Sequence, residues 1–189
     1  AAADRNVCLY DVRARTPVRK VVLAMRTNRI AWNPMEPMNF TCANEDHNLY
    51  TFDMRKMNKA SMVHKDHVGA VMDVSYSPTG QEFATASYDR TVRVWDLAQP
   101  AHPTSTLDVG CFGGIVWGVD WSAASTLWAV ARDGAVRCWD TRVAGSATRA
   151  STTLIADGAA LSVACAPGGD SHAVAVGMDD GRVVLLDAR

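Results

Sequence analysis

The chain has 189 residues, 48% of them hydrophobic, which is enough for one domain with a buried core. Its formal net charge of −1 excludes a strong nonspecific attraction to nucleic acid or to an anionic membrane. No apolar run approaches the roughly 20 residues that a membrane-spanning helix needs, and the first residues lack the pattern of a signal peptide. The five cysteines are scattered and lack the spacing of zinc ligands, so we expect reduced core thiols, no metal site and no cofactor.

Five strand-like segments that end in Asp recur along the chain. They are NVCLYD ending at Asp11, HNLYTFD at Asp53, RTVRVWD at Asp96, GAVRCWD at Asp140 and GRVVLLD at Asp187. Successive members of this series lie 42, 43, 44 and 47 residues apart. Another Asp stands seven positions before each of them, at Asp4, Asp46, Asp89, Asp133 and Asp180. Because two positions keep register over the whole length, the chain is built from repeated units.

A second strand-like segment begins the core of each of the last four units. It reads RIAWNP at 29–34, DVSYSP at 73–78, GVDWSA at 118–123 and SVACAP at 162–167. In the third unit Val74 and Tyr76 share one face of a strand, as do Val92 and Val94. A Pro-Thr-Gly turn and a later Asp turn divide this unit into three antiparallel strands, which is most of one propeller blade.

These units resemble WD40 β-propeller repeats, whose period is roughly 40–45 residues. The resemblance implies an all-β fold over residues 1–189, in which each repeat supplies the outer strand of one blade and the inner three strands of the next. It implies about four blades. Because seven blades are usual in this family, we expect the chain to be part of a larger propeller.

The composition changes near residues 97–100, although the repeat period does not. All four lysines and all three glutamates lie before this point. Residues 1–96 carry 13 basic and 11 acidic side chains, and residues 97–189 carry 6 and 9. The two halves therefore have net charges of +2 and −3, which predicts different surfaces but not a domain boundary.

One His, one Ser and one Asp in the third unit could be interpreted as a catalytic set. The resemblance implies instead a buried structural network of His67, Ser87, Asp89 and Trp95. In that network Asp89 accepts a hydrogen bond from His67, and the Ser87 hydroxyl links the imidazole to the Trp95 indole. The sequence supplies no nucleophile elbow and no oxyanion site, so we predict no enzymatic activity.

The other units lack this set of residues. The His position holds Leu23, Phe112 and Ala156; the Ser position holds Asn44, Ala131 and Met178; the Trp position holds Phe52, Trp139 and Leu186. We expect those blades to depend on apolar packing, and the blade that ends at Asp96 to resist local opening best.

Four units continue past the terminal Asp with any residue and then Arg, at Arg13, Arg55, Arg142 and Arg189. This pattern resembles the WDxR box by which many WD40 substrate receptors dock on the adaptor of a cullin–RING ubiquitin ligase. A guanidinium at a blade edge can bind a partner carboxylate through two parallel hydrogen bonds. The alternative is an ion pair with the neighbouring Asp of the same blade, which contributes little when exposed.

Two predicted loops, residues 25–29 and 54–59, are basic and rich in Met. Their cations are Arg26, Arg29, Lys56 and Lys59. They could contact RNA phosphate in a ribonucleoprotein, or a flexible peptide. Because an aromatic stacking platform and a large positive net charge are both lacking, protein contact is the favoured interpretation.

Residues 4–93 contain the distinctive strings MRTN, WNPME, ANEDHNLYTFDMR and MDVSYSPTG, and resemble the Sof family. These are WD-repeat and SOF-domain proteins of the nucleolar small-subunit processome. The resemblance implies a scaffold of the nucleolus, with the cytoplasm as the alternative location, that associates with a small nucleolar ribonucleoprotein during pre-ribosomal RNA processing. Some members also serve as cullin–RING substrate receptors.

Residues 97–189 resemble WD40 repeats in general and not the Sof family. One short motif, Gly113–Trp117 with the nearby WDTR, is similar to the WD40 diphthine methylesterase of diphthamide synthesis. That similarity leaves a hydrolase as a third hypothesis, after the ribosome-biogenesis scaffold and the ligase substrate receptor.

Overall fold

The computed structural model describes residues 4–99, 102–107, 112–142, 152–155, 157–166 and 173–187. Within this part of the chain every regular element is a β-strand, which confirms the all-β prediction. None of these residues forms a helix long and apolar enough to cross a membrane.

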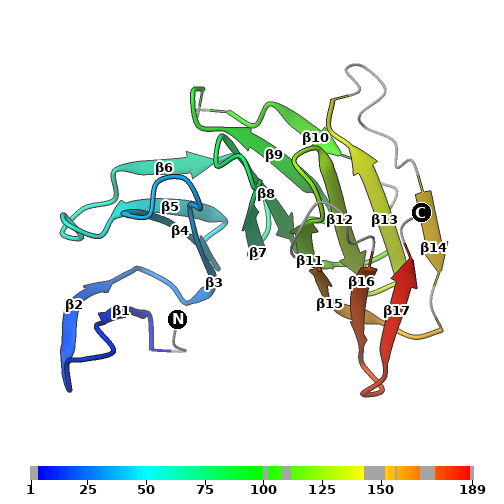
Figure 1. The fold of residues 1–189 in the computed structure, drawn as a ribbon, viewed down its shortest axis with the longest axis horizontal. Coiled ribbons are helices and arrows are strands. Elements are labelled where there is room, and N and C mark those ends of the chain that lie inside the picture. The colour runs from blue at the N-terminus through cyan, green and yellow to red at the C-terminus, as the bar shows by residue number, and fades with distance from the viewer. Residues whose placement is uncertain are drawn as a thin grey trace.

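The strands form five antiparallel sheets that follow one another in chain order (Figure 1). The first sheet contains β1 (Asn6–Tyr10) and β2 (Pro17–Val22). The second contains β3 (Thr27–Trp32), β4 (Asn39–Asn44), β5 (Asn48–Asp53) and β6 (Met62–Lys65). The third contains β7 (Val71–Tyr76), β8 (Glu82–Ser87), β9 (Val92–Asp96) and β10 (Ser105–Leu107). The fourth contains β11 (Val116–Trp121), β12 (Thr126–Ala131), β13 (Ala135–Asp140) and β14 (Thr152–Ile155). The fifth contains β15 (Ala160–Cys165), β16 (Ala173–Met178) and β17 (Val183–Asp187).

Tight turns set the up-and-down order of strands in the third sheet. The turn predicted after β7 is closed by the Gly80 N–H, which donates to the Ser77 carbonyl at 2.8 Å. Gly80 has a φ of 66°, a left-handed conformation that glycine adopts without steric cost. The turn between β8 and β9 is held by Asp89 Oδ1, which accepts from the Thr91 N–H at 3.0 Å.

The innermost strands β3, β7, β11 and β15 contact one another in that order, so consecutive sheets meet along them (Figure 1). The chain leaves each sheet through its outermost strand and then enters the next sheet at the innermost one. This arrangement of four-stranded sheets is that of propeller blades.

Four buried apolar clusters fill the spaces between the five sheets. The strand β8 shows why one sheet can serve two of them. Phe83 stacks on Trp95 in the cluster shared with the second sheet, at 5.9 Å between ring centroids. Ala84 and Ala86 point the other way and pack in the cluster shared with the fourth sheet. Because successive side chains of a strand alternate between faces, both faces of the third sheet are buried.

Two aspartates of the innermost strands join the second, third, fourth and fifth sheets. Asp73 Oδ2 accepts from the backbone N–H of Val119 at 3.2 Å, and Asp73 Oδ1 lies 3.2 Å from Nε of Arg29. Asp120 Oδ2 accepts from the backbone N–H of Cys165 at 2.8 Å. Burial raises the pKa of Asp73 to about 6, although the neighbouring Arg29 opposes that shift.

Candidate functional site

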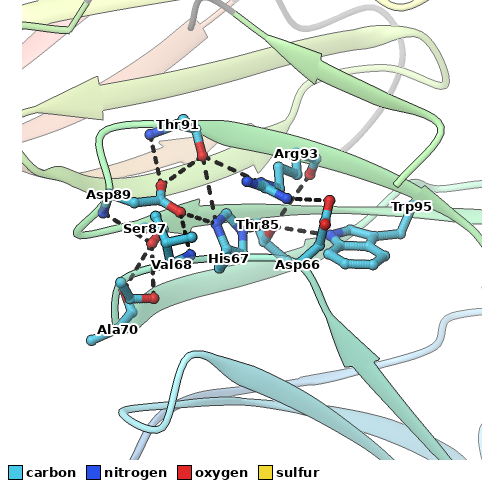
Figure 2. A network of polar contacts seen from close by, with 11 residues as sticks. Asp66, His67, Val68, Ala70, Thr85, Ser87, Asp89, Thr91, Arg93 and Trp95 are labelled. Atoms are coloured by element: carbon cyan, nitrogen blue, oxygen red, sulfur yellow. Dashed lines mark hydrogen bonds and ion pairs between the residues drawn. The ribbon is translucent and has the colours of Figure 1, made fainter. Parts of the chain in front are cut away.

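The His67 network lies on the face of the third sheet that is turned toward the second sheet (Figure 2). His67 Nδ1 is 2.8 Å from Asp89 Oδ2, and His67 Nε2 is 2.8 Å from the Thr85 hydroxyl. Trp95 Nε1 donates to the same hydroxyl at 3.1 Å. A carboxylate only accepts, so Nδ1 carries a proton. Desolvation lowers the pKa of His67, which favours the neutral ring, and in that form Nε2 accepts from the Thr85 hydroxyl. The imidazole is therefore held on both sides.

The role predicted for Ser87 is wrong, because Thr85 makes the link between His67 and Trp95. Ser87 Oγ donates instead to the carbonyls of Gly69 and Ala70, at 3.2 and 3.0 Å. It also accepts from the Asp89 N–H at 3.1 Å. Both hydroxyls project from the same face of β8, but Ser87 lies at the strand end and closes the loop. Its hydroxyl is committed to backbone groups, so the three residues do not have the arrangement of a catalytic triad.

The two titratable residues of this network have shifted pKa values. Desolvation lowers the pKa of His67, although the hydrogen bond to Asp89 opposes this shift. Burial alone would raise the pKa of Asp89, but hydrogen bonds from His67, Thr91 and Val68 lower it overall. Both folded-state pKa values therefore lie below those of the unfolded chain, near 6.5 and 3.8. The pair contributes stability at neutral pH, and that contribution is lost as the pH falls.

The fourth sheet shows what replaces the network elsewhere. The position of Thr85 is occupied by Ala129, and Trp139 Nε1 has no acceptor in the described protein. Phe112 takes the position of the His and packs on Trp139, at 6.1 Å between ring centroids. The guanidinium of Arg137 lies over the Phe112 ring at 4.1 Å. Apolar and cation–π contacts thus substitute for hydrogen bonds there. The corresponding Ala156 of the fifth sheet lies outside the described residues.

We expect backbone amides around Ser87 and Trp95 to exchange with solvent at least about tenfold more slowly than those around Ala131 and Trp139. The reason is that local opening of the third sheet must break the hydrogen bonds of His67, whereas the fourth sheet has no equivalent. Hydrogen–deuterium exchange with peptide-level mass spectrometry measures both pairs in one sample. Equal protection of the two pairs would show that the network adds nothing to local stability.

A second buried polar network was missed by sequence reasoning. The Tyr76 hydroxyl lies 2.6 Å from the Thr41 hydroxyl, which is 2.7 Å from that of Thr51. The Thr51 hydroxyl in turn lies 3.0 Å from His64 Nε2. This chain of contacts joins the second sheet to the third. The sequence carried a signal for this network, namely a Thr in each of two consecutive strand segments. In the structure Thr41 and Thr51 are paired across β4 and β5.

In the first four units the terminal Asp holds a turn whether or not an Arg follows it. Asp53 Oδ1 accepts from the backbone N–H two residues later at 2.8 Å, and Asp96 does the same with Ala98 at 2.8 Å. The same turn occurs at Asp11, whose Oδ1 accepts from the Arg13 N–H at 2.8 Å. It also occurs at Asp140, whose Oδ1 accepts from the Arg142 N–H. The Asp is therefore explained by turn formation. The Arg is not required by the turn.

Two of these arginines adopt the same geometry at the edges of different sheets. Arg55 Nε and Nη2 donate to the Asp53 carboxylate at 3.0 and 2.7 Å. Arg142 Nε and Nη2 donate to Asp140 at the same distances. These hydrogen bonds lower the pKa of each carboxyl to about 2. The guanidinium side chains remain 69% and 76% exposed, so their outer edges face solvent. Arg189 lies outside the described residues.

The four predicted ribonucleoprotein contacts do not form one surface. Arg29 is not on a loop, because it lies in β3 and pairs with Asp73 of the next sheet. Arg26 pairs with Glu45 at 2.6 Å. Lys56 and Lys59 lie together at the β5–β6 loop, where they line a pocket with Arg19 and Arg55.

A groove of about 420 Å³ runs along the innermost strands β3, β7, β11 and β15. Some of its polar groups are already paired. Ser75 Oγ donates to Asp120 Oδ1 at 2.9 Å, and Nε of Arg29 pairs with Asp73. The groove thus lies where the innermost strands of consecutive sheets meet.

Comparison with known proteins identifies two repeats directly. Residues 58–96 and 102–140 match the family model described as WD domain, G-beta repeat. The first match covers β6 to β9 and the second covers β10 to β13, so each begins at the outer strand of one sheet and ends in the next. Both segments are WD40 repeats. The fold predicted from the resemblance is confirmed at this level.

Half of the chain is also homologous to the Sof1/DCAF13 proteins. It is 63% identical over 96 residues to "DDB1- and CUL4-associated factor 13" of Mus musculus, which is 51% of this chain and 22% of that protein. It is 54% identical over 93 residues to "Protein SOF1" of Saccharomyces cerevisiae, which is 49% of this chain and 19% of that protein. The matched segment thus covers about a fifth of the length of these relatives. The predicted Sof resemblance is confirmed.

Proposed function

We propose that this WD40 chain belongs to a non-enzymatic scaffold that assembles proteins and ribonucleoprotein components during small-subunit ribosome biogenesis in the nucleolus. The observation that carries the proposal is the 54–63% identity to Sof1/DCAF13 proteins over half the chain. The position of Ser87 also supports a non-catalytic role, since its hydroxyl bonds to backbone carbonyls and not to His67.

Exposed side chains in the strings that carry the Sof resemblance support a partner-binding role. Trp32 and Met35 both lie in the string WNPME. They are 45% and 67% exposed. Trp32 packs against Phe40 at 5.1 Å between ring centroids, but a large part of it remains at the surface. Aromatic and Met side chains are enriched at protein interfaces, so these two residues suit contact with another protein.

We expect affinity purification of the tagged chain from nucleolar extract to recover a small nucleolar RNA together with processome proteins. Replacing Trp32 and Met35 by Ala should reduce that recovery at least about tenfold, because buried aromatic anchors dominate interface energetics. Tyr88→Ala is the matched control, since Tyr88 is 56% exposed in the turn that follows β8 of the neighbouring sheet. Recovery that is absent for the unaltered chain, or equally sensitive to Tyr88→Ala, would contradict the proposal.

The alternative function is a substrate receptor that docks on a cullin–RING ligase adaptor. It is favoured by the shared geometry of Arg55 and Arg142, and by the name of the mouse relative, which describes that protein as associated with DDB1 and CUL4. The same purification distinguishes the two functions. Recovery of the adaptor that is lost in Arg55→Ala and Arg142→Ala, without loss of the RNA, assigns the arginines to docking. Arg55→Lys tests the need for two parallel hydrogen bonds, because Lys keeps only the charge.

A further inference from the structure

A basic pocket of about 450 Å³ opens at the edge of the second sheet. Its wall comes from β2 on one side and from the β5–β6 loop on the other. The lining residues are Arg19, Asp53, Arg55, Lys56, Asn58, Lys59 and Ser61. The pocket thus joins Arg19 to a segment that begins 34 residues later in the sequence, and it combines four cations with a single carboxylate.

The one carboxylate of the pocket is already paired. Asp53 accepts two hydrogen bonds from the Arg55 guanidinium, and this contact lowers the pKa of Asp53 to about 2. Among the described residues none forms an ion pair with Arg19, Lys56 or Lys59, although the charge of Asp53 also acts on Lys56. Three cations therefore face one concave surface with little of their charge compensated. Their mutual repulsion is unfavourable, and an anion in the pocket would relieve it.

The loop that carries two of these cations is fixed in place. Met57 is 2% exposed and packs in the cluster between the first and second sheets. The backbone N–H of Lys56 donates to the Asp53 carbonyl at 2.9 Å. Both the N–H and the hydroxyl of Ser61 donate to the Thr51 carbonyl at 2.8 Å. Because the loop is anchored at its start, middle and end, its backbone does not have to be ordered on binding.

We propose that this pocket binds a phosphorylated serine or threonine in an acidic segment of a partner protein. A phosphate monoester carries about two negative charges and three acceptor oxygens at neutral pH. The pocket offers matching donors in three unpaired cations and the exposed Asn58 amide. The inference rests on the proposed scaffold role, since it specifies the chemistry of one partner.

A peptide fits the pocket better than RNA does. Proteins that hold single-stranded RNA combine a basic track with aromatic side chains on which bases stack. The pocket lining contains no aromatic residue. The cations also surround one concave site, whereas a polynucleotide backbone needs a continuous track of charge.

The test is fluorescence anisotropy with the purified chain and a fluorescein-labelled peptide, Gly-Glu-Glu-phosphoSer-Glu-Glu-Gly. We expect it to bind at least about tenfold more tightly than the same peptide with unmodified Ser, because charge-assisted hydrogen bonds are the strong ones. Arg19→Glu and Lys59→Glu should each weaken binding at least about tenfold. Lys20→Glu is the matched control: it makes the same charge change one residue from Arg19, outside the pocket lining. All three positions are exposed, and circular dichroism checks that each variant is folded.

Three outcomes overturn the inference. The first is no binding of the phosphopeptide, or equal binding of the unmodified peptide. The second is an equal loss of phosphopeptide affinity in Lys20→Glu, which would show that only the net charge of the chain matters. The third is tighter binding of a labelled twelve-nucleotide oligouridine with the same dependence on Arg19 and Lys59. Because the assay uses only the purified chain and peptide, its failure leaves recovery of the small nucleolar RNA untouched, and the reverse also holds.

Discussion

Replacing Asp89 with Ala is expected to lower the free energy of unfolding at pH 7 by about 3–5 kcal/mol, because several buried donors would lose their acceptor at once. The Asp89 carboxylate accepts from His67 Nδ1 at 2.8 Å and from the Val68 N–H at 3.1 Å. It also accepts from the N–H and the hydroxyl of Thr91, at 3.0 and 2.6 Å. Alanine would leave these donors without a partner in a site where the His67 side chain is fully buried. Urea denaturation followed by circular dichroism measures the change.

The matched control for this substitution is Asp133→Ala in the fourth sheet. Asp133 occupies the same position in its repeat, and it accepts from the Gly113 N–H at 2.6 Å and the Ala135 N–H at 3.0 Å. No histidine faces it, since Phe112 stands at that position. We therefore expect a cost of only about 1–2 kcal/mol. If the two substitutions cost the same, the buried His67–Asp89 pair adds nothing beyond the turn that both aspartates hold.

Thr85→Val should destabilise the chain by about 2–4 kcal/mol, although valine has nearly the same shape. The Thr85 hydroxyl is shared by His67 Nε2 and Trp95 Nε1, so a methyl group in its place leaves two buried nitrogen atoms without a partner. The pH dependence should also change, because His67 would lose the donor that favours its neutral form. Thermal unfolding of the variant at several pH values between 5 and 8 measures both effects.

Ser87→Ala is the natural comparison for Thr85→Val, since the two hydroxyls lie on one face of the same strand. We expect it to cost only about 1 kcal/mol. The Ala70 carbonyl that Ser87 contacts still accepts from the Tyr88 N–H at 2.8 Å. A larger loss in Ser87→Ala than in Thr85→Val would restore Ser87 as the link between His67 and Trp95.

The different roles of the Thr85 and Ser87 hydroxyls could not be predicted from the sequence. The repeat period located the strands β7, β8 and β9 and brought His67, Asp89 and Trp95 into one blade. It did not decide which hydroxyl of β8 reaches the ring. Strand alternation places Thr85 and Ser87 on the same face. The choice depends on how far along β8 the Trp95 indole lies. Only tertiary packing determines this position.

The basic residues illustrate a different limit. Arg26 and Arg29 appeared equivalent to Lys56 and Lys59 because all four lie in short basic stretches. In the structure the first two are neutralised by Glu45 and Asp73, which are distant in sequence. The pocket cation Arg19 comes from the preceding sheet and could not be grouped with the β5–β6 loop by spacing. Pairing of charges across sheets decides which cations remain available, and a repeat pattern carries no information about it.

The aspartates that join consecutive sheets bind partners that are synthesised later than the aspartates themselves. Asp73 precedes the Val119 N–H that it binds by 46 residues, and Asp120 precedes that of Cys165 by 45. A ribosome that adds roughly 5–20 residues per second needs a few seconds to make each such interval. During those seconds the sheet that was made first has a carboxylate without its backbone N–H partner. Its apolar face is also not yet covered by the next sheet. The nascent chain is therefore most vulnerable to aggregation just before each new blade arrives, and its earliest blades are the first to be protected.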